Sequence, residues 1–522
     1  MHKPIHREST MIESRIRLAA RALLAAAIAG VCACTPVADD TTTESASIAA
    51  RSTMPPYISN KQVSTDCGVD AIAAPPPGFA HRPYAEIAEM PERLAKWQAV
   101  GAERPLAETD PERVSPGYVL IEPGFRKPMF LVNNAKEIVA TVENDNFSFT
   151  QFLDDGSRLA SSNMYSEVFR KGGGHRGCVE EYGPDGSLNW RLALATDNYI
   201  HHHDVYKLEN GNVLAVVWER VPADLAVELG RNPENVAENG DFWFDGIVEV
   251  NPSTTEIVWE WSARYHMIQD FDRGKANYGV VADHPERLDI NTIRLNRDGS
   301  VDADWTHVNA LDYNPDLDQI IVSSNYLSEV YVIDHSTTPF ESQGHSGGRY
   351  GKGGDLLYRW GNPERYGRGT EDDRKLFNQH DVQWIRDGLP GAGNILIFNN
   401  GNGRLRPYST VVEFALPMNA DGSYVLNGDE PYGPTDLIWE YAPTDEDIFF
   451  SFFISGAQRL ANGNTLVNQG AGARVREVTP DGEIVWEYVY DDGAEGPHML
   501  FRAIRYPADH PAVIAIMESS SQ

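Results

Sequence analysis

From about residue 126 onward, the chain alternates single apolar and polar residues in short runs, as in Ile247-Val248-Glu249-Val250. Turns rich in Gly, Asn, Asp and Pro separate these runs. Alternation with a period of two predicts half-buried β-strands. The same region lacks the long 3.6-residue periodicity of amphipathic helices. The sequence therefore predicts an all-β body.

Two kinds of hairpin recur along this body. Segments 179–190 and 475–486 both read as an alternating strand, a Pro-Asp-Gly turn and a strand that reaches a Trp, and looser copies end at Trp259, Trp360 and Trp439. The second kind has an Asn-Gly turn, at Asn210-Gly211 and Asn462-Gly463, which is a strong hairpin signal. Two hairpins per unit make a four-stranded sheet, and such sheets repeated around an axis make a propeller.

We predict a six-bladed β-propeller over 126–515, with five or seven blades as alternatives. Five units lie between about 178 and 495, and a further blade is expected within 128–177. Long insertions at 264–300 and 336–378 are expected to decorate one rim of the propeller.

The N-terminal part has a different character. A basic stretch, an apolar run and Val31-Cys32-Ala33-Cys34 give residues 1–34 the order of a lipoprotein signal peptide, with Cys34 as the lipidated residue. Plain cleavage near Ala33 is the alternative. Residues 35–53 read as a flexible tether and 54–125 as a proline-rich segment that wraps the body. The protein is therefore expected to be exported, as a periplasmic or outer-membrane lipoprotein whose lipid anchor alone touches the membrane.

Composition narrows the possible partners. Hydrophobic residues make up 41% of the chain, which is ample for a packed core, and the formal net charge is −32. Such acidity argues against nucleic acid or an anionic membrane surface as a partner, although a local basic pocket can still hold a small anion. In an oxidising compartment Cys67 and Cys178 are expected to form a disulfide, with two free thiols as the alternative. The oligomeric state stays open.

Candidate chemistry emerges when the repeats are aligned on their turns. His203, His307, His380 and Ser455 each lie seven residues before a turn residue. Rotation about a propeller axis relates equivalent positions, so three histidines at one position predict a ring. Such a ring supplies a nucleophile with general acid and base partners, or holds a metal through neutral imidazoles. Repeated hydrogen bonding between blades is the structural alternative.

The neighbours of these histidines add further candidates. Asp204 and Asp381 follow two of the ring histidines directly, and we expect them to orient the rings. His202 precedes His203, which leaves the alignment there uncertain by one residue. Asn400 and Arg404 follow the next strand of the His380 unit, and the guanidinium of Arg404 is a candidate for binding an oxyanion.

These motifs together resemble the bacterial arylsulfotransferase family. The resemblance rests on His203-Asp204, His307-Val308-Asn309, Gln379-His380-Asp381, and Asn399-Asn400-Gly401 with Arg404, and it covers roughly residues 130–510. It implies sulfuryl transfer from an aryl sulfate to a phenol without PAPS and without a cofactor. It also implies that His380 is the nucleophile and that His203 and His307 bind sulfate and handle phenol protons. His202, Asn325, Asn400, Arg404 and Ser455 are the expected substrate-binding residues.

Two features depart from the family pattern. Asn325 stands where the family has an arginine, a loss that weakens sulfate stabilisation by a few kcal/mol, and the chain has little room for a separate N-terminal β-domain. Two other functions therefore stay open. One is a metal-dependent propeller hydrolase or lyase with a divalent metal at the histidine ring. The other is a non-catalytic surface lipoprotein that uses the propeller as a scaffold.

Overall fold

In the computed structural model, all described residues belong to one compact unit, Pro56–Gln522. The structure describes residues 63–68, 105–123, 128–142, 147–169, 172–296, 299–402, 405–444, 449–491, 493 and 498–520. The predicted signal peptide, with Cys34, and the predicted tether lie outside the described residues. Within the described residues, no helix is both long and apolar enough to cross a membrane.

Six four-stranded antiparallel sheets form the blades of the predicted six-bladed propeller. Blade 1 contains β26 (Leu500–Tyr506), β1 (Tyr118–Pro123), β2 (Met129–Val132) and β3 (Ile138–Val142). Blade 2 contains β4 (Phe147–Phe152), β5 (Arg158–Asn163), β6 (Gly177–Tyr182) and β7 (Leu188–Ala193). Blade 3 contains β8 (Tyr199–Lys207), β9 (Val213–Pro222), β10 (Asp241–Asn251) and β11 (Glu256–Ser262).

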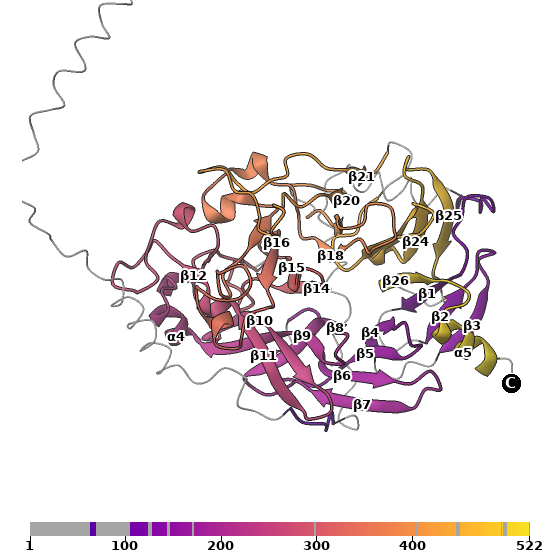
Figure 1. Cartoon of the computed structure of the whole chain (residues 1–522), viewed down its shortest axis with the longest axis horizontal. Helices are drawn as coiled ribbons and strands as arrows, with labels where there is room; N and C mark the ends of the chain where they lie inside the picture. The colour runs from indigo at the N-terminus through magenta and orange to yellow at the C-terminus, as the bar shows by residue number, and fades with distance from the viewer. Residues whose placement is uncertain are drawn as a thin grey trace, which may run out of the picture. The chain divides into compact units, whose positions relative to one another are not determined.

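The remaining three blades follow in chain order. Blade 4 contains β14 (Val308–Asn314), β15 (Gln319–Ser324), β16 (Glu329–Asp334) and β17 (Tyr358–Trp360). Blade 5 contains β18 (His380–Trp384), β19 (Ile395–Asn399), β20 (Thr410–Phe414) and β21 (Trp439–Tyr441), and blade 6 contains β22 (Gly456–Arg459), β23 (Thr465–Gln469), β24 (Arg474–Val478) and β25 (Ile484–Val489). Strands β26, β4, β8, β14 and β18, the first strands given for blades 1 to 5, face the centre of the ring (Figure 1). In blade 6, β22 contacts the inner strands β18 and β26.

The two ends of the propeller sequence meet in blade 1. Strand β26 pairs with β1, for example Ile121 with Ala503, so the last strand of the chain completes the first sheet. This closure corrects two boundaries. Strand β1 (Tyr118–Pro123) lies inside the segment expected to wrap the body, so the propeller begins before residue 126. The range 128–177 is also not one blade, because β3 closes blade 1 and β4 opens blade 2.

The recurring tryptophans join neighbouring blades. The indole N–H of Trp360 in blade 4 donates to the carbonyl of Pro434 in blade 5 at 2.9 Å. Trp439 in blade 5 donates to Pro480 in blade 6 at 2.7 Å. Trp486 in blade 6 donates across the closure to Asn134 in blade 1 at 3.2 Å. In these three tryptophans the indole N–H, which favours a hydrogen-bond partner, finds it in the next blade.

The hydrophobic core is distributed between the blades. One buried cluster combines Trp259 and Trp261 of blade 3 with Ile320 and Tyr331 of blade 4. Further clusters join blades 4 and 5, blades 5 and 6, and blades 6 and 1. The sheets thus bury apolar side chains on both faces, which explains the nearly continuous apolar runs in the second strands β9 and β19.

The insertions lie beside blades 3 and 4. The first carries β12 (Met267–Ile268) and β13 (Leu288–Asp289), which form a small parallel pair. The second lies between β16 and β18 and folds mainly as turns with short 3-10 helices. Two α-helices complete the described structure, namely α4 (Ala223–Glu228) after β9 and α5 (Pro511–Ser519) after β26.

A short N-terminal segment is fixed to blade 2. The carbonyl of Ser64 accepts a hydrogen bond from the backbone N–H of Ala193 at 2.6 Å. Cys67 and Cys178 form a disulfide with their Cα atoms 5.7 Å apart, and both side chains are buried. The disulfide therefore ties the residues before the propeller to β6.

Removing this disulfide should destabilise the protein. We expect Cys67→Ala/Cys178→Ala to lower the free energy of unfolding by about 2–5 kcal/mol, because the bridge closes a loop of 111 residues in the unfolded chain. Denaturant unfolding of both proteins, with and without reductant, measures the effect. Reductant should bring the wild type down to the level of the variant and leave the variant unchanged. Equal stability of the two oxidised proteins would contradict the expectation.

Candidate functional site

The strands next to the axis are irregular where the candidate histidines lie. The pairing register shifts between His201 and Val205 in β8 and between Val308 and Ala310 in β14. His203 and His307 adopt left-handed backbone conformations, with φ of 58° and 50°. Non-glycine residues rarely adopt such angles, and bulges often re-aim side chains near active sites. In blade 5 the left-handed residue is Asp381 (φ 58°), one position after His380. His380 is therefore not strictly equivalent to His203 and His307.

His203 and His307 lie next to each other. Their ring centroids are 4.7 Å apart in an edge-to-face arrangement. His202 links this pair to Asp245. Its Nδ1 lies 2.8 Å from Nδ1 of His203, and its Nε2 lies 3.0 Å from Oδ1 of Asp245. The ring of His202 stacks on Trp218 at 3.9 Å. His202 therefore orients His203 within the protein.

A buried carboxyl group holds His307. Its Nδ1 lies 2.5 Å from Oδ2 of Asp304. Burial lowers the pKa of His307 to about 4, whereas burial, with the nearby charge of Asp245, raises the pKa of Asp304 well above its usual range. These two opposite shifts favour a pair in which His307 and Asp304 share one proton between Nδ1 and Oδ2. Wherever that proton resides between the two groups, Nε2 of His307 remains protonated and able to donate.

An arginine from the first insertion reaches this histidine through an aromatic ring. Tyr326 stacks on His307 with centroids 4.3 Å apart, and the guanidinium of Arg294 lies 3.6 Å from the centroid of Tyr326. The structure shows no hydrogen-bond partner for Nε of Arg294 among the described residues. A guanidinium held by stacking keeps its N–H groups available for an anion.

His380 has a defined tautomer. Its Nδ1 lies 2.8 Å from Oδ1 of Asn400, and its Nε2 accepts the backbone N–H of Ile454 at 3.2 Å. Because the amide oxygen only accepts, Nδ1 carries the proton and Nε2 carries the lone pair. Burial lowers the pKa of His380 to about 4, so the imidazole is neutral near pH 7. This is the protonation state that a histidine nucleophile needs.

A glycine-rich loop covers His203. The backbone N–H of His203 donates to the carbonyl of Gly174 at 2.9 Å. A Cβ atom at Gly174 would lie 2.2 Å from Nε2 of His203, and the φ of this glycine is +82°. Any larger residue would collide with the ring, so glycine is required here. Gly173 next to it faces His307, whose Cε1 a Cβ would approach to 3.7 Å.

The two aspartates that follow ring histidines have another role than the expected one. Asp204 accepts the backbone N–H of Leu311 at 3.1 Å, and Asp381 accepts that of Ala457 at 2.9 Å. Both also bind Arg502 of β26, at 3.3 and 3.0 Å. They therefore hold blades together at the axis, while Asp304 and Asn400 orient the imidazoles of His307 and His380.

Several other predicted site residues are engaged within the protein. Asn400 also donates through Nδ2 to the carbonyls of Ser451 and Ile454. Asn325 donates to the carbonyls of Asn378 and Gln379, at 2.9 and 3.3 Å, which fixes the residues just before His380.

Ser455 is likewise occupied. Its hydroxyl donates to Oγ of Ser451 at 2.8 Å and accepts the backbone N–H of Gly470 at 3.0 Å. Ser455 thus holds the loop that carries Ile454 beside His380.

Arg404 lies outside the described residues.

The sequence alone did not point to Arg294, Asp304, Asp245 or Arg502. Asp304 precedes His307 by three residues, and its proximity was a usable local signal. Arg294 and Asp245 come from other segments of the chain and share no motif with His307. Only the folded chain brings them to it.

Among the described residues, the structure shows one group of His, Cys, Asp or Glu side chains suited to a metal ion, and it consists of His266, His345 and Asp355 rather than the ring histidines. Nδ1 of His307 and both nitrogens of His380 contact protein groups.

A family model described as Arylsulfotransferase (ASST) matches residues 186–501. No curated protein matches the chain. Solved structures similar to the chain include a protein of unknown function from Bacteroides caccae (14% identity, TM-score 0.38, covering 74% of this chain and 98% of that one). A putative 6-phosphogluconolactonase from Bacteroides fragilis is also similar (10% identity, TM-score 0.35, covering 76% and 100%). A virginiamycin B lyase from Staphylococcus aureus has 10% identity and a TM-score of 0.30, with 66% and 85% covered.

The buried neutral histidines should make the protein sensitive to acid. Burial lowers the pKa of His201 to about 3 and that of His380 to about 4. Unfolding returns each to about 6.5, so at these two groups the unfolded state binds more protons between about pH 4 and 6.5. These two histidines should therefore lower the free energy of unfolding as the pH drops below 6.5, by up to about 1.4 kcal/mol per pH unit each, whereas Glu122 and Glu219, whose pKa values burial raises to about 7, contribute with the opposite sign.

Denaturant unfolding at several pH values measures this slope. His201→Gln removes a buried histidine that contacts Ser161 and the carbonyl of Val216, and it should reduce the slope by about one proton. His284→Gln, at a half-exposed position, is the matched control and should keep the wild-type slope. An unchanged slope in His201→Gln would refute this account.

Proposed function

The chain belongs to the arylsulfotransferase (ASST) family, and from that premise we propose that it transfers a sulfuryl group from an aryl sulfate to a phenol through a sulfohistidine at His380. The observation that carries the proposal is the state of His380. Its Nδ1–H donates to Asn400 and its pKa is lowered to about 4. Nε2 is therefore unprotonated at neutral pH, and its lone pair exchanges the hydrogen bond from the Ile454 N–H for the bond to sulfur.

We propose the following first half-reaction. Nε2 of His380 attacks sulfur, an N–S bond forms and the bond between sulfur and the aryl oxygen breaks. The leaving aryl oxygen takes the proton from Nε2 of His307, which the Asp304 pair keeps protonated. In the second half-reaction a phenol oxygen attacks sulfur, the N–S bond breaks and the phenol proton returns to His307. The reaction as written needs no cofactor.

Arg294 supports the same proposal as the source of positive charge. Charge accumulates on the sulfuryl oxygens in the transition state, and preorganised cationic donors stabilise it. Asn325 supplies no charge and its amide is bound to backbone carbonyls. Arg294, stacked on Tyr326 beside His307, is the cation that we assign to the sulfate in place of the family arginine.

We further propose that the enzyme acts outside the cytoplasm as a lipoprotein anchored through Cys34. The order of the first 34 residues is the basis, and the Cys67–Cys178 disulfide supports it, because such bridges persist in oxidising compartments. Small aryl sulfates and phenols are then the partners, and the acidic surface disfavours nucleic acid.

The sulfohistidine is directly testable. The purified protein incubated briefly with 4-nitrophenyl sulfate should gain a sulfuryl adduct of about 80 Da, mapping to His380, as nitrophenol is released. His380→Ala should form no adduct and transfer no sulfuryl group, while His284→Ala should behave as the wild type. Because the pKa of His380 is about 4, kcat/KM should fall only below about pH 5. Full activity in His380→Ala would overturn the assignment.

Arg294→Met should weaken sulfate stabilisation while keeping the length of the side chain. We expect kcat/KM for the aryl sulfate to fall by about 100-fold, corresponding to roughly 2.7 kcal/mol of lost charge stabilisation. Arg294→Lys should retain part of the activity. Arg273→Met is the matched control, since Arg273 is exposed in the same insertion. If both methionine variants kept wild-type kcat/KM, Arg294 would have no part in binding sulfate.

A further inference from the structure

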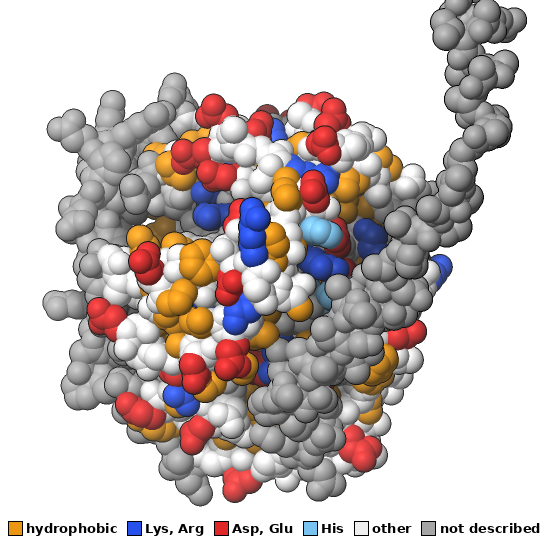
Figure 2. All heavy atoms as spheres, turned by 90° about the vertical axis from the view of Figure 1, so that its left-hand side faces the viewer, with side chains coloured by type: hydrophobic (Ala, Val, Ile, Leu, Met, Phe, Trp, Pro, Cys, Tyr) orange, Lys and Arg blue, Asp and Glu red, His pale blue; other side chains and the backbone are white. Residues whose placement is uncertain are grey.

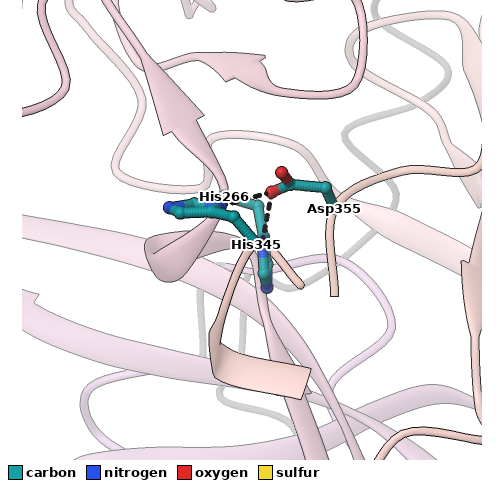
Figure 3. Close-up of side chains that lie close together, drawn as sticks. All are labelled: His266, His345 and Asp355. Carbon is teal, nitrogen blue, oxygen red and sulfur yellow. Dashed lines mark hydrogen bonds and ion pairs between the residues drawn. The ribbon is translucent and has the colours of Figure 1, made fainter. Parts of the chain in front are cut away.

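Two histidines and an aspartate come together away from the histidine ring, at the junction of the two insertions. His266 follows β11 and belongs to the first insertion, whereas His345 and Asp355 belong to the second. Nδ1 of His266 lies 2.9 Å from Oδ1 of Asp355, and Nδ1 of His345 lies 2.8 Å from the same oxygen (Figure 3). The three ligand atoms lie within 4.8 Å of one another.

The proton on His266 is fixed from its other side. Its Nε2 lies 2.8 Å from the backbone carbonyl of Ser342. A carbonyl only accepts, so Nε2 carries the proton, and in the neutral imidazole Nδ1 then carries a lone pair. That lone pair faces a carboxylate oxygen at 2.9 Å in a fully buried position. Two facing lone pairs repel unless a cation lies between them or a second proton makes the ring an imidazolium.

The surroundings favour a bound cation. A ligating histidine characteristically donates its other N–H to a backbone carbonyl, as His266 does. Tetrahedral bonds of about 2.1 Å place neighbouring ligand atoms about 3.4 Å apart, and the two separations between Nδ1 and Oδ1, 2.9 and 2.8 Å, lie about 0.5 Å below that value. Nε of Arg287 lies 3.7 Å from Oδ2 of Asp355, so it approaches the second carboxylate oxygen and leaves Oδ1 to the histidines.

The site is built for close approach and remains accessible on one side. A Cβ at Gly354 would lie 2.5 Å from Nε2 of His266 and 2.0 Å from the carbonyl of Ser342, so this position must be glycine. The indole N–H of Trp261 donates to the carbonyl of Gly354 at 2.7 Å, which fixes the loop. The side chain of His345 is 36% exposed. Figure 2, which views the side of the molecule near α4 and β12, shows histidine side chains at the surface.

We propose that His266, His345 and Asp355 bind one divalent first-row transition-metal ion. Two imidazole nitrogens and one carboxylate oxygen suit Zn²⁺, Co²⁺ or Fe²⁺ and disfavour Mg²⁺ and Ca²⁺, which prefer oxygen ligands. Water completes the coordination on the exposed side of His345. The ion joins the second insertion to the end of β11, and thereby fixes blade 4 to blade 3.

Zinc binding to the full-length protein tests the site. The chelator-treated protein is titrated with Zn²⁺, the bound zinc is counted by elemental mass spectrometry after gel filtration, and Co²⁺ is used as a visible-absorption probe. The wild type should bind one zinc per chain and unfold at a higher temperature with Zn²⁺ than without it. With Co²⁺ it should show the visible absorption of Co²⁺ bound by nitrogen and oxygen ligands. His345→Ala, at the exposed position, should weaken binding at least tenfold, and Asp355→Asn should also weaken it.

His284→Ala is the matched control. His284 is a half-exposed histidine of the first insertion, paired with Glu286, and its loss should leave the zinc stoichiometry unchanged. Equal zinc binding by the wild type and His345→Ala, or no zinc retained by the wild type, would overturn the proposal. Circular dichroism of each variant identifies loss of folding. The result is independent of sulfuryl transfer, because none of these residues contacts His380.

Discussion

Arg502 joins three of the six blades at the axis of the propeller. It extends from β26 in blade 1 to Asp204 in blade 3 and Asp381 in blade 5. Burial lowers the pKa of Arg502, but the two carboxylates more than offset this effect and raise it above its usual range. A ring of sheets brings inward-facing polar groups together in a buried space, where unpaired charges are costly. Because both aspartates follow ring histidines, this ion network also sets the positions of His203 and His380.

The same burial prepares the histidines chemically. Protein charges and dipoles act strongly in a site that excludes water. Desolvation keeps His380 neutral, Asn400 fixes its tautomer, and the Asp304–His307 pair retains a proton. One histidine therefore presents a lone pair and its neighbour presents an N–H, although both belong to the same residue type. Their different partners, an amide and a carboxyl group, create this division of roles.

The first insertion contributes to two separate features. It provides Arg294, which stacks on Tyr326 beside His307, and His266, which meets Asp355 of the second insertion. Arg294 is thus a cation that reaches His307 from outside the repeat. Asn325 ties blade 4 to the residues before His380.

The sequence by itself determined the all-β class, the six repeats and the three histidines, because alternation, turn residues and the recurring tryptophans are local signals. It also identified the family through motifs in order. The tertiary structure alone decided which strand closes the ring, since β26 and β1 are far apart in sequence. It likewise decided the partners of each histidine. Arg294 and Asp245 come from other segments, and a linear pattern carries no information about which side chains meet across a folded ring.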